Sequence, residues 1–97
     1  MITRAARLES QLRQHLDPVL VQVADDSHRH AGPGHAGARP EGETHYSVLV
    51  VAARFAGQTR IARSRTVHAL LDAEFQGGLH ALTLTLRTPE EQARLAG

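Results

Sequence analysis

Histidine is the residue type with the greatest potential for metal chemistry in this chain. The chain contains seven histidines and no cysteine. His28, His30 and His35 fall within the glycine- and proline-rich segment 26–42, and His80 follows a Gly-Gly pair. Imidazole is a good ligand for iron, zinc and copper, and a loop can fold around a metal ion. A metal site in this chain would therefore use imidazole, and any thiolate would have to come from a partner.

Spacing alone does not single out one set of ligands. The intervals of two and five residues between the loop histidines match no dedicated zinc pattern. A solvated loop rich in histidine is an equally good reading of segment 26–42. For His80, a strand-end histidine bonded to backbone is the favoured reading from its position alone. The other histidines, His15, His45 and His68, are expected to be structural.

Arginine supplies the second group of candidate residues. All eleven basic residues are arginine, although the net charge is only +1. Segment 54–65 holds Arg54, Arg60, Arg63 and Arg65 and no acidic residue. Because a basic cluster at a helix start suits phosphate, Arg60, Arg63 and Arg65 are candidates for nucleic-acid binding. Contact with an acidic protein surface and a solvated helix face are the alternatives.

Composition indicates one globular domain and excludes several classes. The chain has 97 residues, 41% hydrophobic and 22% charged, which is ordinary for a soluble domain. The apolar run 48–53 is too short to cross a bilayer, and residues 1–10 lack the apolar region of a secretory signal. The lack of cysteine excludes disulfides and favours a cytoplasmic location. We expect no membrane attachment, and no enzyme activity because no nucleophile elbow, P-loop, HExxH or paired-carboxylate pattern occurs.

Periodicity predicts the elements that must position these residues. Two stretches have the helical period, namely 3–16 and 59–75, the second with an expected break near 63–65. Three stretches read as strands, namely 19–25, 44–53 and 80–87. Thr88-Pro89-Glu90-Glu91 is a helix start, so 88–97 should form a short C-terminal helix or tail. The order αββααβ(α) predicts an α+β domain over 1–97, with helices packed on one face of a three-stranded sheet.

Six short motifs, taken in chain order, resemble the BolA family. They are Asp26-Ser27-His28-Arg29-His30, Glu43-Thr44-His45-Tyr46, Arg54-Phe55-Ala56-Gly57, Arg63-Ser64-Arg65-Thr66-Val67, Leu79-His80-Ala81-Leu82-Thr83-Leu84 and Thr88-Pro89-Glu90-Glu91. Together they span roughly the whole domain. The resemblance implies a fold of the class II KH type, which agrees with the element order above.

The resemblance also implies a ligand set for a metal cluster. It implies pairing with a monothiol glutaredoxin around a shared [2Fe-2S] cluster. The family's C-terminal histidine ligand matches His80, and its loop ligand matches His30, with His35 or His28 as alternatives. Since such a cluster takes four ligands, mostly thiolates, the sulfurs would come from the glutaredoxin cysteine and a glutathione bound to it.

Three functions compete on these observations. The leading hypothesis is an interaction protein in iron homeostasis or iron-sulfur cluster trafficking, a monomer or weak homodimer when free. The alternative, also implied by the resemblance, is a DNA-binding transcriptional regulator that uses helix 59–75. A stand-alone metal binder using the histidine loop is a weaker third. The histidines favour the first and the arginines favour DNA, but a net charge of +1 is low for a dedicated DNA binder.

Overall fold

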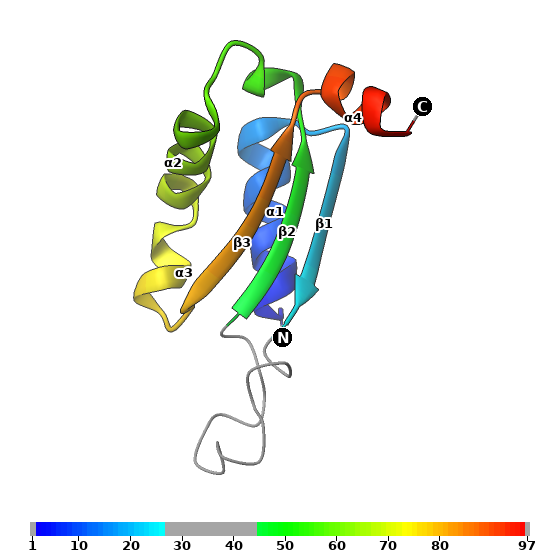
Figure 1. Ribbon diagram of the computed structural model, residues 1–97. Coiled ribbons are helices and arrows are strands. Elements are labelled where there is room, and N and C mark those ends of the chain that lie inside the picture. The colour runs from blue at the N-terminus through cyan, green and yellow to red at the C-terminus, as the bar shows by residue number, and fades with distance from the viewer. Residues whose placement is uncertain (1, 27–44, 97) are drawn as a thin grey trace.

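A three-stranded sheet organises the chain (Figure 1). The computed structural model describes residues 2–26 and 45–96. In chain order its elements are α1 (Arg4–Leu16), β1 (Leu20–Asp25), β2 (His45–Val51), the 3-10 turn η3 (Ala53–Phe55), α2 (Arg60–Leu70), α3 (Asp72–Gln76), β3 (Ala81–Arg87) and α4 (Pro89–Ala96). This order confirms the predicted αββααβ(α) arrangement. Apart from Asp26, the predicted loop 26–42 lies outside the described residues.

The central strand, β2, pairs differently with its two neighbours. It runs antiparallel to β1, where Leu20 lies opposite Val51, and parallel to β3, where His45 lies opposite Ala81. Because β2 and β3 run in the same direction, their first residues meet at one end of the sheet. The last residue of β1, Asp25, lies at that same end, opposite the second residue of β2.

The core lies between one face of the sheet and helices α1 and α2. Alternate residues of β2 point into it, as expected for a strand covered on that face. α1 contributes leucines spaced by four, and lies behind the sheet in Figure 1. Each fully buried leucine contributes about 2 kcal/mol. The fully buried members of this cluster include Leu8, Leu12, Val48, Val50, Phe55 and Val67, and Leu82, Leu84 and Leu86 of β3 pack against it.

The ends of the helices follow the capping signals in the sequence. Thr3 caps α1, because its Oγ1 accepts a hydrogen bond of 3.1 Å from the Ala6 backbone N–H. Asp17 ends the helix in the left-handed conformation, directly before Pro18. The predicted capping box at residues 88–91 is also confirmed, and it starts α4.

Two local predictions are wrong. The expected break near 63–65 does not occur, because Thr59 caps α2 and places these residues within the helix's first turns. The interruption lies at Leu71, a buried residue between α2 and α3. The first strand was predicted to begin at Val19. Its N–H does bond to Val51 O, but it precedes β1 and its side chain is exposed.

Candidate functional site

Two histidines lie side by side at the end of the sheet where β2 and β3 begin. His45 is the first residue of β2, and His80 directly precedes β3. The parallel register places His45 opposite Ala81, so its neighbour His80 is close by. The centroids of the two rings are 5.8 Å apart, with the ring planes inclined by 58°. His80 is exposed, as its candidate role as a metal ligand requires.

The segment that carries the other candidate ligands is tied to this same end of the sheet. The Asp26 backbone N–H donates a 2.8 Å hydrogen bond to His45 O. The Asp26 carboxylate accepts a hydrogen bond from the Ser47 hydroxyl. Asp26, directly after β1, is therefore hydrogen-bonded to His45, the first residue of β2. We call this end, with Asp26, His45 and His80, the histidine edge.

The described residues alone do not complete a metal site. Within 2–26 and 45–96, no three histidine, aspartate or glutamate side chains gather as they would around a metal ion. The candidate loop ligands His28, His30 and His35 lie outside the described residues. A metal held at the histidine edge would need ligands from that loop or from a partner.

The turn before His80 is held by ion pairs from α1. Glu74 of α3 accepts hydrogen bonds from Arg4 (2.9 Å) and Arg7 (2.8 Å), and Arg4 also donates to Gly77 O at 2.8 Å. The hydrogen bond from Arg7 is the main cause that lowers the pKa of Glu74, against a smaller opposing effect of burial. Leu79 is buried and its N–H bonds to Glu74 O. His80 thus follows a well-anchored turn.

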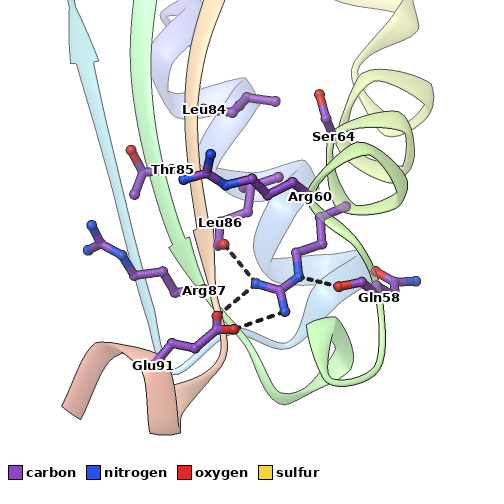
Figure 2. Close-up of a pocket in the computed structure, with 9 residues that line it drawn as sticks. Gln58, Arg60, Ser64, Leu84, Thr85, Leu86, Arg87 and Glu91 are labelled. Atoms are coloured by element: carbon purple, nitrogen blue, oxygen red, sulfur yellow. Dashed lines mark hydrogen bonds and ion pairs between the residues drawn. The ribbon is translucent and has the colours of Figure 1, made fainter. Parts of the chain in front are cut away.

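The three candidate arginines of α2 have different environments. Arg60 and Arg65 are exposed, whereas Arg63 is buried. The Arg63 guanidinium donates to Gln58 O and Leu86 O, each at 3.0 Å, and pairs with Glu91 at 2.7 Å (Figure 2). The alternative that Arg63 belongs to a solvated helix face is therefore wrong.

Arg63 acts as a structural residue that holds α4 against α2 and β3. Its guanidinium also lies 5.7 Å from the centre of the Phe55 ring. The hydrogen bond from Arg63, with a smaller contribution from the Thr88 backbone N–H, lowers the pKa of Glu91 to about 2. The sequence spacing could have predicted the burial of Arg63. Arg63 lies four residues before Val67 and therefore shares the buried face of the helix with it.

An open groove of about 680 Å³ lies between α2 and the second half of β3 (Figure 2). Arg60 and Ser64 line it from α2, and Leu84, Leu86 and Arg87 line it from β3. We call this feature the arginine groove. The sequence indicated its basic character but not its shape, which depends on the packing of α2 beside β3.

Helices on one face of a mixed three-stranded sheet, in the order αββααβ, define a small α+β domain of the class II KH type. The chain belongs to the BolA family, because the family model described as BolA-like protein matches residues 12–91. No helix in residues 2–26 and 45–96 is long and apolar enough to cross a membrane.

Individual relatives agree with this assignment. The chain is 39% identical over 93 residues to SufE-like protein 1 of Arabidopsis thaliana, covering 92% of this chain but 24% of that protein. It is 39% identical over 88 residues to Protein BOLA1 of the same plant, covering 91% of this chain and 55% of that protein. The solved BolA domain of SufE1 from Arabidopsis thaliana has a TM-score of 0.81 and 37% identity, with coverage of 94% and 98%.

These relatives also bear on the expected function and the expected location of this chain. The chain spans 24% and 55% of the two plant proteins, so what the whole relatives do does not transfer to it directly. Both are named as chloroplastic, and the first also as mitochondrial. The cytoplasmic location of this chain stays a prediction.

Proposed function

We propose that this chain is an interaction protein that shares a [2Fe-2S] cluster with a monothiol glutaredoxin, in iron homeostasis or cluster trafficking. The observation that carries the proposal is the histidine edge. An exposed imidazole, His80, lies beside His45 at the point where the histidine-bearing segment 27–44 leaves and rejoins the sheet. A binding role of this kind needs no catalytic residues in this chain.

The donor set fits a shared cluster better than one held by this chain alone. A [2Fe-2S] cluster takes four protein ligands, mostly thiolates, and imidazole replaces thiolate on one iron in some centres. This chain offers imidazole and no cysteine. In the proposed complex His80 and one loop histidine bind one iron. The loop ligand is His30, with His35 or His28 as alternatives. The glutaredoxin cysteine and its glutathione supply the sulfurs.

Reconstitution tests the proposal. The chain would be mixed with a monothiol glutaredoxin, glutathione, iron and sulfide, and the visible absorption and circular dichroism recorded. We expect a cluster spectrum in the mixture and none with this chain alone. His80→Ala should change the spectrum or shorten the lifetime of the mixed cluster. His68→Ala is the matched control, because His68 is an exposed histidine on α2 that lies outside the histidine edge.

Two results would contradict the proposal. One is a stable cluster on this chain without glutaredoxin. The other is a His80→Ala mixture that behaves like the wild type. Within the loop, His30→Ala should perturb the mixed cluster more than His28→Ala. A larger effect of His35→Ala would move the loop ligand to that residue.

DNA binding is a second candidate function, carried by Arg60 and Arg65. Both are exposed on α2, and neither has a hydrogen bond or ion pair within the described part of the chain. Arg63 contributes no phosphate contact while its donors are engaged. Two contacts give a log–log salt slope of about −1.8. Titration of a duplex at several salt concentrations tests this, and no binding at low salt would exclude it.

A further inference from the structure

The outer edge of β3 presents unpaired backbone groups to the arginine groove. β3 is an edge strand, because the sheet order is β1-β2-β3. Arg87 O accepts a 2.9 Å hydrogen bond from Ala52 N, so the backbone of Arg87 faces β2. Both polar backbone groups of a strand residue point to one side, and the side alternates along the strand. The backbones of Leu84 and Leu86 therefore face away from β2.

Only part of this edge is occupied by the protein itself. Leu86 O accepts a hydrogen bond from the Arg63 guanidinium. For the backbone of Leu84, no hydrogen-bond partner on the outer side is found among residues 2–26 and 45–96. An edge strand with free N–H and C=O groups is a template for another strand. The arginine groove therefore has main-chain donors and acceptors along one wall.

The charge in the groove selects an anionic occupant. In Figure 2 the Arg60 side chain extends from the start of α2 toward β3, and the Arg87 side chain lies on the side of β3 that is away from α2. Arg60 has no ion-pair partner within the described part of the chain, and the Arg87 guanidinium donates to the neutral Gln92 amide at 2.8 Å. The carboxylate in the groove, Glu91, is already paired with Arg63. The groove thus carries uncompensated positive charge.

An acidic peptide fits these features better than a nucleic acid. No aromatic side chain lines the groove, so bases would have no stacking platform. The sequence Gly57-Gln58-Thr59-Arg60 departs from the GXXG loop by which KH domains clamp a nucleic-acid backbone. A peptide backbone, in contrast, can pair directly with the free edge of β3.

We propose that an extended, acidic segment of a partner protein binds in the arginine groove by adding to β3 as a fourth strand. Arg87 lies on the face of the sheet opposite the core, because its strand neighbour Leu86 packs against the core. Arg60 comes from the helix side. Adjacent residues of an added strand point to opposite faces. The segment therefore carries two neighbouring acidic residues, one for each arginine.

The test uses a fluorescein-labelled peptide of about eight residues, with two adjacent glutamates flanked by valine and threonine. Anisotropy is measured with this chain alone, so the outcome is independent of any cluster or glutaredoxin. Arg60→Ala should weaken binding about tenfold, since a charge-assisted contact is lost. Arg65→Ala is the matched control on the same helix, and it should change the affinity less than about twofold.

A backbone-modified peptide separates strand addition from simple charge attraction. N-methylation at alternate residues of the peptide removes the backbone N–H donors that would pair with β3, while the glutamate charges stay the same. This change should abolish binding. Hydrogen exchange of the Leu84 amide should slow when the unmodified peptide is bound. Equal affinity for the methylated peptide would overturn the proposal.

Two further results would also overturn it. One is a dissociation constant weaker than about 1 mM for the unmodified peptide. The other is that a single-stranded oligonucleotide of about twelve nucleotides binds more tightly than the peptide and is equally sensitive to Arg60→Ala. That second result would make the groove a nucleic-acid site.

Discussion

At the scale of single residues, Arg63 connects parts of the chain that are far apart in sequence. Its guanidinium bonds to Gln58 O before α2, to Leu86 O in β3 and to Glu91 in α4. A guanidinium has five donors in a fixed fork and stays charged, so it is suited to several acceptors at once. Its burial is tolerated because these acceptors replace water.

Replacing Arg63 should destabilise the fold. Arg63→Ala would leave Leu86 O and Gln58 O without their donor and separate α4 from α2. We expect a loss of about 2 kcal/mol in the free energy of unfolding, measured by urea denaturation. Arg65→Ala, on the exposed side of the same helix, should stay within about 0.5 kcal/mol of the wild type. Equal stability of the two variants would contradict the structural role of Arg63.

The sequence predicted part of the candidate site and missed the rest for identifiable reasons. The strand-end position of His80 followed from the Gly-Gly pair and the alternation after it. The contact between His45 and His80 depends on β2 and β3 being parallel neighbours, and periodicity within each strand does not specify its partner. Arg63 was misplaced because its charge was given more weight than its spacing from Val67 and Leu71.

At the scale of elements, caps determined the boundaries more reliably than composition did. The helix start at residues 88–91 was predicted from a short-range pattern, and it is confirmed. The break in the second helical stretch was predicted at the basic cluster 63–65 and lies at Leu71. A cap depends on local bonds that can be read from a few residues. The end of α2, in contrast, coincides with a leucine that is buried in the tertiary fold.

The cap of α2 should contribute measurably to stability. Thr59 Oγ1 accepts a 3.1 Å hydrogen bond from the Ala62 backbone N–H. Thr59→Ala leaves that N–H without its partner and should cost about 1 kcal/mol. Thermal unfolding would show a lower midpoint than for Ser10→Ala, an exposed change within α1 that removes no cap. A midpoint for Thr59→Ala at or above that of Ser10→Ala would contradict the capping role.

The attachment of α4 should depend on pH. Arg63 and the Thr88 N–H lower the pKa of Glu91 to about 2 from an ordinary value of 4.5. A carboxyl whose pKa is lower in the folded state stabilises the fold above its unfolded value. This contribution is present above about pH 4.5 and is lost as the pH falls toward 2.

Comparing Glu91→Gln with the wild type would test this dependence. The stability difference should be largest near neutral pH and shrink between about pH 4.5 and 2, as followed by urea denaturation. Gln92→Ala is the control, since it changes a side chain of the same helix that does not titrate. If the stability difference between Glu91→Gln and the wild type stayed constant with pH, Glu91 would be excluded as the cause of the pH dependence.

At the scale of the whole molecule, β3 has a different surface at each end. Its first residues lie at the histidine edge, and its second half forms one wall of the arginine groove. A strand rises about 3.3 Å per residue, so His80 and Leu86 are about 20 Å apart. The proposed cluster and the proposed peptide would therefore occupy separate places on one rigid element.

The two surfaces should act independently in the chain alone. Sites more than about 10 Å apart that share no partner usually have additive effects, within about 0.5 kcal/mol. His80→Ala should therefore bind the acidic peptide within about twofold of the wild type, and the Arg60→Ala/His80→Ala double variant should match Arg60→Ala. Anisotropy titration of the four proteins measures this directly. If His80→Ala alone weakened peptide binding as much as Arg60→Ala does, the peptide would extend along β3 to the histidine edge.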